Sequence, residues 1–463
     1  MTVFAIFFWV CLTYYLILLF YYLVFGIVGF FESNKRNHES REENYEAIMS
    51  SSFTLPVSII IPAHNEELWV RDTVLSVLRL DYPQFELIVV DDESTDRTLD
   101  ILKELLDLQY VNNVYSDQFN SGKILGFLKS RKYPHVSVLS KKSGQKKAGA
   151  LNAALNLAKY KYVCVMDCDT ILERDALLKV MAHVQKDPEH VVGIGSFFGL
   201  ANGFRIENGV VLEKRFIAVP LIAYQNLEYI RSFIGNRIGW SRQNAMPIIS
   251  GGFGVWRRDI VLAAGAFDPW YSSEDLEFTF RAHDYLIRNG KRDYRITMLP
   301  HYVGWTEGPH TISQLIKQRN RWQRVTNEAV WRYRHMLFNP KYGRLGCVSL
   351  PYFVFYEVLG VFFEIGSVLV TVFGCLIGMI AWRMLLNFLM MMLLCQSLTS
   401  LIPLFILNRD YRLLKVREVA YFVILSFFEF FWYRWIIVWA KVEGFIQFFC
   451  GKRTMDSIQR HRT

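Results

Sequence analysis

Two aspartates stand one residue apart at the end of an apolar run, in the segment VMDCDT (165–170). In an extended segment, residues i and i+2 face the same side, so we expect Asp167 and Asp169 to converge on one point. Two uncompensated carboxylates there would repel each other, and a divalent cation removes that conflict. Oxygen ligands suit Mg²⁺ or Mn²⁺, and Mg²⁺ is typically held by one or two carboxylates together with substrate phosphates. The alternative is that the pair only caps the helix or turn before ILERDALLKV.

A basic turn precedes this pair, in the segment KKSGQKKAGALN (141–152). It places Lys146 and Lys147 at the start of a predicted helix, where the helix dipole disfavours cations unless an anion is near. The turn is not a Walker A loop, because neither of its glycines is followed by Lys-Ser/Thr. A solvated basic turn would also explain these lysines, but a basic turn beside a metal-type carboxylate pair suits a diphosphate.

Four apolar, β-branched runs alternate with helical patterns around these residues. Alternating strands and helices predict an α/β fold with a mostly parallel sheet, whose ligands bind beyond the C-terminal strand ends. Three of those ends are followed by the acidic segments AHNEE, DDESTD and DCDT, so we expect a charged site at this edge. The four predicted strands are VSIIIP (57–62), ELIVVDD (86–92), HVSVLS (135–140) and YVCVMD (162–167).

The composition indicates a membrane protein, because hydrophobic residues make up 52% of the 463 residues and aromatic residues 16%. Residues 3–31 carry no charge and are long enough to span a bilayer. No basic residue precedes Lys35, so the n-region of a signal peptide is missing and we predict a retained transmembrane helix. Lys35, Arg36 and Arg41 follow this helix, which predicts that its C-terminal end and the polar region after it are cytoplasmic.

A second apolar block extends from about residue 348 to 449. Strict alternation of its spans places the C-terminus outside, whereas the basic tail argues for inside, so the topology of this end stays open. Glu357 and Glu364 share one helical face, where they either line a channel or pair with basic residues of interfacial helices. Charges at Arg383 and in 408–418 divide the block into three predicted spans, near 350–381, 384–407 and 419–441.

The cysteines, the net charge and the absence of two hydrolase motifs argue against several classes of function. Seven cysteines without regular spacing predict reduced thiols and argue against a disulfide framework or a zinc site. The net charge of +9 fits the positive-inside bias of a membrane protein better than nucleic-acid binding. The chain contains no G-x-S-x-G elbow and no H-E-x-x-H motif, so hydrolysis is not indicated.

Three further motifs follow in order, SGGFGVWRRD (250–259), YSSEDLEFTFRAH (271–283) and TISQLIKQRNRWQRV (311–325). Together with the earlier segments they resemble the inverting family-2 glycosyltransferases, specifically the membrane-integrated branch. That branch includes hyaluronan, cellulose and poly-N-acetylglucosamine synthases. The resemblance extends from Val57 through the second apolar block, and it implies a GT-A-type α/β domain with interfacial and transmembrane helices.

The resemblance implies a role for each matched residue. By this match Asp169, together with Asp167, binds Mg²⁺ or Mn²⁺, while Asp275 is the general base with Glu274 beside it. The residues implied to contact the acceptor are Gly251, Gly252, Phe253 and Trp322, although the glycine loop could also be an ordinary turn. The residues implied to contact the nucleotide sugar are Pro62, Ala63, Asn65, Glu66, Asp91, Asp92, Lys147, Asp167, Gln318, Arg321 and Trp322.

The segment with the Q-x-x-R-W motif also predicts an amphipathic helix from its residues alone, and such a helix lies in a membrane interface. TEGP (306–309), just before it, resembles another family element whose role we leave open. The predicted apolar face comprises Ile312, Leu315, Ile316, Trp322, Val325 and Ala329. The predicted polar side comprises Lys317, Arg319, Arg321, Arg324, Arg332 and Arg334.

We therefore predict six regions along the chain. They leave little room for a regulatory domain, so we expect any regulation to require a small membrane or regulatory subunit. The regions are a transmembrane helix (1–33), a solvated linker (34–55), a cytoplasmic GT-A domain (56–310), interfacial helices (311–347), a transmembrane block (348–450) and a basic tail (451–463).

Together, these expectations predict an enzyme of the cell (inner) membrane that adds sugars from a UDP-sugar to a growing glycan. Kinship with poly-N-acetylglucosamine synthases favours N-acetylglucosamine, then glucose. Two rival functions are transfer of one sugar to a lipid carrier and an export or receptor subunit with an inactive transferase domain. The Q-x-x-R-W match and the later spans argue against the first. Intact Asp167, Asp169, Asp275 and Arg321 argue against the second.

Overall fold

The computed structural model describes residues 2–112, 115–119, 121–378 and 382–451. They form two compact units. The sheet unit comprises Arg36–Phe216 and Met246–Gly308. The helical unit comprises Ile217–Ala245 and the described residues before Arg36 and after Gly308. The predicted basic tail lies, apart from Gly451, outside the described residues.

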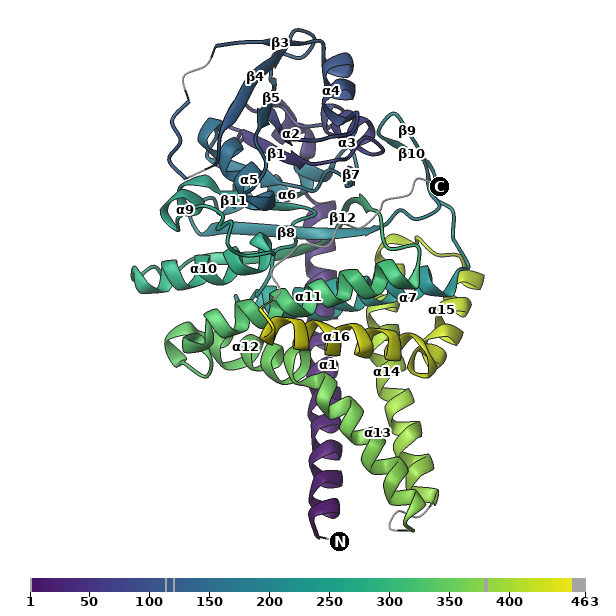
Figure 1. The fold of residues 1–463 in the computed structure, drawn as a ribbon. Helices are drawn as coiled ribbons and strands as arrows, with labels where there is room; N and C mark the ends of the chain where they lie inside the picture. The colour runs from purple at the N-terminus through teal and green to yellow at the C-terminus, as the bar shows by residue number, and fades with distance from the viewer. Residues whose placement is uncertain (1, 113–114, 120, 379–381, 452–463) are drawn as a thin grey trace. The chain divides into compact units, whose positions relative to one another are not determined.

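The sheet unit is built on ten strands in the order β3-β4-β5-β2-β1-β6-β11-β8-β12-β7 (Figure 1). Its centre is the parallel run β5-β2-β1-β6, whose strands are the four predicted from apolar runs. The α/β class is therefore confirmed, while antiparallel neighbours make the complete sheet mixed. The central strands are β1 (Val57–Ala63), β2 (Phe85–Asp92), β5 (Val136–Lys141) and β6 (Tyr162–Val165).

The strands that the sequence analysis did not place flank this parallel centre. β11 pairs antiparallel with both β6 and β8, and β12 pairs parallel with β8. A separate two-stranded sheet is formed by β9 and β10. These strands are β3 (Leu108–Tyr110), β4 (Ile124–Ser130), β7 (Ile171–Leu172), β8 (Val191–Leu200), β9 (Arg205–Glu207), β10 (Val210–Glu213), β11 (Gly254–Arg257) and β12 (Arg295–Thr306).

Helices of the sheet unit bury the apolar faces that their sequences present. In α3, for example, the side chains of Val70, Val74 and Val77 are fully buried, as the helical spacing predicts. The helices are α2 (Tyr45–Ser50), α3 (Val70–Leu78), α4 (Thr98–Leu106), α5 (Lys146–Leu157), α6 (Ala176–Lys186), α9 (Arg258–Ala263) and α10 (Glu274–Arg288).

The predicted solvated linker is largely helical. Helix α1 runs without a break from Thr2 to Arg41, and its last turns pack against α6. Arg36 Nη1 lies 3.1 Å from His183 Nδ1, and Lys186 forms an ion pair with Glu43. Burial and then Arg36 lower the pKa of His183 to about 3. The polar composition of this segment did not indicate an irregular linker, because Glu, Lys and Arg are good helix formers and their charges can form ion pairs.

The helical unit contains a segment that the sequence analysis placed inside the catalytic domain. Residues 217–245 form α7 (Pro220–Ile230), the π-helical segment η1 (Arg231–Arg237) and α8 (Ile238–Arg242). In Figure 1, α11 (Ile312–Arg332) and α16 (Tyr433–Phe449) run side by side and crosswise to α1, α13 (Gly360–Leu376) and α14 (Trp382–Tyr411). A Cβ on Gly444 of α16 would come within 2.7 Å of the Asn320 carbonyl of α11, so these helices approach closely.

Two helices of the described chain are long and apolar enough to cross a membrane, in Ile6–Arg41 and Leu385–Tyr411. The other two predicted spans are bent helix pairs. Leu345–Val358 meets Gly360–Leu376 at 48°, and Val416–Phe431 meets Tyr433–Phe449 at 49°. The described residues thus hold up to four spans if each bent pair counts as one. Residues 379–381, at the end of one predicted span, lie outside the described residues.

The buried His283 of α10 should make the sheet unit less stable as the pH falls. Its Nε2–H donates to the Met246 carbonyl at 2.9 Å, so its Nδ1 accepts from the Tyr294 hydroxyl at 2.6 Å. Burial lowers the pKa of His283 from 6.5 to about 4. Between those values the unfolded chain binds a proton that the folded chain does not. The free energy of unfolding therefore falls by up to about 3 kcal/mol as the pH drops through that interval.

The check is the midpoint of thermal unfolding of the purified protein in detergent between about pH 7 and 4. His283→Gln should show a shallower loss of stability with falling pH than the parent protein. The control is His38→Gln, which changes an exposed histidine of α1 and should follow the parent. Equal slopes for His283→Gln and the parent would contradict the assignment.

Candidate active site

The loops that leave β1 and β2 are tied together by their own polar groups. Asn65 Oδ1 accepts from the Thr95 N–H at 2.8 Å, and the Glu66 N–H donates to Thr98 Oγ1 at 2.7 Å. Glu67 accepts from the Arg97 N–H at 3.1 Å. Asn65 holds a left-handed backbone with φ of 57°. Some of the polar residues at these strand ends therefore hold the two loops together at the edge of the site.

The two aspartates that end β2 differ in their surroundings. Asp92 Oδ1 lies 2.5 Å from the fully buried Lys141 Nζ, so its charge is balanced within the protein. Asp91 accepts from the Ser94 N–H at 3.4 Å, and burial raises the pKa of its carboxyl. The strand register places Asp91 opposite Ala63, next to Pro62 at the end of β1. The site therefore brings Pro62, Ala63 and Asp91 together.

A cluster of charges joins α5, the D-x-D segment and α10. Lys147 Nζ lies 2.6 Å from Asp167 Oδ1 and 2.5 Å from Glu274 Oε1. Burial alone would lower the pKa of Lys147, but Asp167, Glu274 and Asp275 raise it overall. Burial raises the pKa of the Glu274 carboxyl. The Lys147 ammonium thus faces the carboxyl groups of Asp167 and Glu274, with that of Asp275 nearby.

Three hydrogen bonds fix the carboxylate of Asp275 at the start of α10. Its Oδ2 accepts from the Gly251 N–H at 2.9 Å, and its Oδ1 accepts from the Leu276 N–H at 2.8 Å and from the Ser273 hydroxyl. The glycine loop and the E-D motif, far apart in sequence, are therefore in direct contact. Such a network holds a carboxylate in one orientation, as a positioned proton acceptor requires.

The glycines of the SGGFG loop lie against side chains of the protein itself. A Cβ on Gly251 would lie 2.8 Å from Lys147 Nζ and 3.2 Å from Glu274 Oε1. A Cβ on Gly252 would lie 2.7 Å from the Phe198 ring, and Phe253 is completely buried. The protein's own side chains therefore leave no room for a side chain at either glycine, and the Phe253 side chain belongs to the core. Contacts of this loop with the acceptor stay a prediction.

The D-x-D pair does not lie in an extended segment, as the sequence analysis assumed. β6 ends at Val165, and the Thr170 N–H donates to the Asp167 carbonyl at 3.2 Å, which closes a turn. The two carboxylates have different partners, because Asp167 contacts Lys147 while Asp169 Oδ1 accepts from the Thr306 hydroxyl at 3.2 Å. Alternation of side chains along a strand is therefore not what positions this pair.

The described residues contain no group of three or more His, Cys, Asp or Glu side chains arranged to hold a metal ion. A metal at the D-x-D segment would therefore need ligands from outside the protein. That donor set, carboxylate oxygens completed by phosphates and water, is the one that Mg²⁺ commonly takes.

Comparison with protein families decides the class of this site. A family model described as glycosyl transferase family 2 matches residues 58–210. A second, described as glycosyl transferase family group 2, matches residues 162–433, more than half of the chain. The chain belongs to glycosyltransferase family 2. The resemblance inferred from the motifs is thereby confirmed, and the chain is a glycosyltransferase.

Individual relatives agree with this assignment. The probable glycosyltransferase YdaM of Bacillus subtilis is 27% identical over 353 residues, which cover 75% of this chain and 70% of that protein. A poly-β-1,6-N-acetyl-D-glucosamine synthase of Staphylococcus epidermidis is 28% identical over 277 residues, which cover 60% of this chain. That match spans only 56% of the length of the synthase.

A solved structure supports the fold of this family-2 glycosyltransferase. The mannosyltransferase PcManGT of Pyrobaculum calidifontis, in complex with GDP-Man and Mn²⁺, aligns with a TM-score of 0.50 at 14% identity. The alignment covers 90% of this chain and 99% of that one. At this level of identity the likeness shows the fold alone, and it confirms the expected GT-A-type architecture.

The Q-x-x-R-W motif of the glycosyltransferase lies on α11 in the helical unit. Gln318, Arg321 and Trp322 therefore belong to the helical unit. Their contacts with donor and acceptor stay predictions. The predicted faces of α11 are partly confirmed, because Leu315, Val325 and Ala329 are buried while Lys317 and Arg332 are exposed. They are wrong at Arg319 and Arg324, which are buried, and at Ile312 and Trp322, which are exposed. The buried face is mixed: besides the apolar Leu315, Val325 and Ala329 it contains Arg319, Asn320, Gln323, Arg324 and Asn327.

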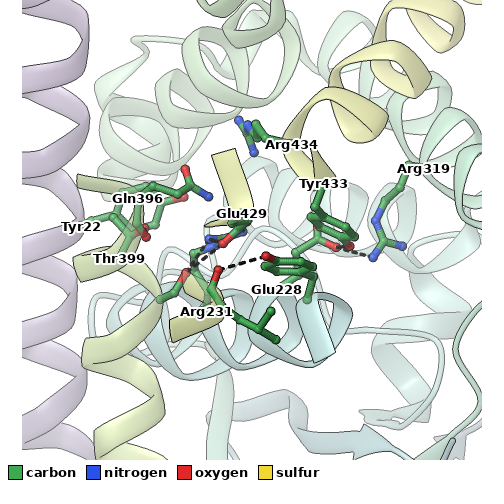
Figure 2. Close-up of polar contacts among 12 residues, drawn as sticks. Tyr22, Glu228, Arg231, Arg319, Gln396, Thr399, Glu429, Tyr433 and Arg434 are labelled. Carbon is green, nitrogen blue, oxygen red and sulfur yellow. Dashed lines mark hydrogen bonds and ion pairs between the residues drawn. The ribbon is translucent and has the colours of Figure 1, made fainter. Parts of the chain in front are cut away.

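Charged side chains of the helical unit form ion pairs with one another. Lys441 Nζ lies 3.0 Å from Glu357 Oε2, and Arg434 Nε donates to Glu364 at 2.8 Å. Of the two alternatives for these glutamates, the structure shows pairing, with basic residues of α16. A third pair, Arg231 with Glu429, is 3.1 Å apart, and Figure 2 shows it among further polar side chains of the unit.

Sequence reasoning missed two contributors to the site. Thr306, the first residue of TEGP, donates to Asp169, and the neighbouring Glu307 accepts from Trp69 Nε1 at 2.9 Å. The resemblance of TEGP to a family element was the available signal. Lys141 was the other omission, and its burial next to Asp92 could not be read from a basic turn.

Two neighbouring glycines should fail in different ways when each is changed to alanine. Gly251→Ala pushes a methyl group against Lys147 and Glu274, so we expect transferase activity to fall about tenfold or more with little change in the unfolding temperature. Gly252→Ala pushes a methyl group against the Phe198 ring in the core, so we expect a lower unfolding temperature.

Sugar transfer and thermal unfolding, measured on both variants and the parent, test this distinction. Full activity of Gly251→Ala would show that the Lys147–Glu274 geometry is not needed for transfer.

Proposed function

We propose that this glycosyltransferase is a processive, inverting β-glycosyltransferase that polymerises a sugar from a UDP-sugar into an extracellular polysaccharide. N-acetylglucosamine is the favoured sugar and glucose the second. The observation that carries this proposal is the Lys147 ammonium shared by Asp167 and Glu274, next to the fixed carboxylate of Asp275. Similarity to a poly-β-1,6-N-acetyl-D-glucosamine synthase supports the sugar and the polymerising activity.

The donor side of the site suits a nucleoside diphosphate. Asp92 is engaged by Lys141, whereas the buried Asp91 accepts from the Ser94 N–H, so Asp91 is the better candidate of the two to bind a base. Lys147 supplies positive charge for the two phosphates. Mg²⁺ or Mn²⁺ bound at Asp169 and Asp167 would neutralise charge on the leaving diphosphate. Thr306 orients Asp169 for this task through its hydroxyl hydrogen bond.

The acceptor side needs one proton acceptor and no covalent nucleophile. As the acceptor oxygen forms its bond to the anomeric carbon, its proton passes to the Asp275 carboxylate, and the bond from that carbon to the diphosphate oxygen breaks. The electron pair of that bond leaves with UDP. Attack from the opposite face inverts the centre, so an α-linked UDP-sugar gives a β-linked product. Glu274 keeps Lys147 in place beside the departing phosphates.

The helical unit supports attachment to a membrane and export of the product. Two of its helices are long and apolar enough to span a bilayer, and basic residues after the first favour a cytoplasmic sheet unit. Polar and charged side chains inside a membrane bundle usually face its interior or a wet pathway. The polar residues on the buried face of α11 and the paired charges around α16 form such an interior, and they support passage of a hydrophilic chain.

The test is transfer from labelled UDP-N-acetylglucosamine or UDP-glucose by the purified protein with Mg²⁺ or Mn²⁺, followed by sizing and linkage analysis of the product. The proposal predicts a β-linked ladder of many additions. A product with one added sugar would rule out the polymerase, and transfer that persists in chelator would rule out the metal.

Asp275→Asn should abolish transfer without abolishing donor binding. The amide cannot take the acceptor proton, so we expect the rate to fall about 100-fold or more. The matched control is Asp284→Asn, which changes an aspartate on the same helix that pairs with Arg288 at 2.8 Å, and it should keep the parent rate. The measurements are UDP release and UDP binding for each protein. UDP release that continues unchanged in Asp275→Asn would defeat the assignment of the base.

A further inference from the structure

Arg319 lies within the Q-x-x-R-W segment and contacts two of its defining residues. Its guanidinium carbon lies 4.1 Å from the centre of the Trp322 ring, and its Nη1 donates to Gln318 Oε1. The Arg319 side chain is only 3% exposed, although the sequence analysis placed it on the polar side of α11. Arg319 therefore contacts both Gln318 and Trp322 of the motif.

Arg319 is in turn held from another helix. Its Nη2 lies 2.5 Å from Glu228 Oε2 of α7, and the Tyr433 hydroxyl of α16 donates to the same oxygen at 2.6 Å. Figure 2 shows Arg319, Glu228 and Tyr433 pointing toward one another. Burial alone would raise the pKa of Glu228, but Arg319 lowers it overall, so the carboxylate is charged. One carboxylate thus connects α7, α11 and α16.

The Trp322 ring combines a fixed contact with an exposed surface. Arg319 covers part of the ring by a cation–π contact, and the Tyr229 ring lies 6.4 Å away, centre to centre. Trp322 nevertheless remains 39% exposed. An indole that is held on one side and open on the other is suited to stack on a sugar ring.

We propose that Glu228 and Arg319 are positioning residues that fix the Trp322 ring, and through it the acceptor sugar. This inference rests on the proposed function and on the predicted contact of Trp322 with the acceptor. The planar guanidinium is needed because it can stack on the indole while its nitrogens bind Glu228 and Gln318. A lysine would keep the charge but could not make these contacts together.

The first experiment detects the position of Trp322 without any turnover. The full-length protein is labelled with 5-fluorotryptophan at its 12 tryptophans, and Trp322→Phe identifies the fluorine NMR signal of Trp322. We expect Glu228→Gln and Arg319→Lys to shift or broaden that signal. The matched control is Glu429→Gln, which breaks the buried pair with Arg231 in the same unit and should leave the Trp322 signal in place. An unmoved signal in Glu228→Gln and Arg319→Lys would overturn the positioning role.

The second experiment connects this position to the acceptor. For the same variants, transfer is measured against the concentration of a short β-linked N-acetylglucosamine oligosaccharide. We expect Glu228→Gln and Arg319→Lys to raise the acceptor KM about tenfold, to shorten the product, and to leave the KM for UDP-sugar near the parent value. A shifted Trp322 signal with an unchanged acceptor KM would overturn the link to the acceptor. Absence of transfer by the parent protein would instead reject the proposed function, which the NMR experiment does not need.

Discussion

The ion pairs of Lys147 are the interaction on which the site depends. The ammonium lies between Asp167, which follows a central strand, and Glu274, which begins α10. These carboxylates, with Asp275, would repel one another without it. The glycine loop can approach only because Gly251 has no side chain, and its N–H then holds Asp275. A single cation therefore determines the spacing between the donor side of the site and the general base.

The sequence predicted the centre of the sheet because buried parallel strands need unbroken apolar runs, such as those that contain Ile60 and Val89. For the charge cluster, the acidic strand end indicated Asp167 and the basic turn indicated Lys147, whereas Glu274 and Asp275 were implied by the family resemblance alone. The sequence could not predict which aspartate of β2 would be balanced by Lys141, since that depends on a contact with a neighbouring strand. An extended conformation was expected at the D-x-D segment because the predicted strand ended at Asp167, whereas β6 ends at Val165.

The prediction failed where polarity was taken as a measure of exposure. Residues up to Arg41 continue α1, and Arg36 contacts His183 although its segment looked like a solvated linker. On α11, Arg319 is buried and Trp322 is exposed, the reverse of the predicted faces. In both segments the charged side chains find partners on other helices. Burying a charge that has a partner costs far less free energy than burying an isolated charge. The hydrophobic pattern of a segment gives no information about such partners on other helices.

The central claim is that Lys147 brings the phosphates of the donor and the general base into one arrangement. It is tested most directly by the single-turnover rate of sugar transfer in Lys147→Met, at saturating UDP-sugar and Mn²⁺. Methionine keeps most of the volume of the side chain but removes the charge, so the account predicts a loss of about 100-fold or more. A rate equal to that of the parent would show that the site works without this ammonium and would contradict the account.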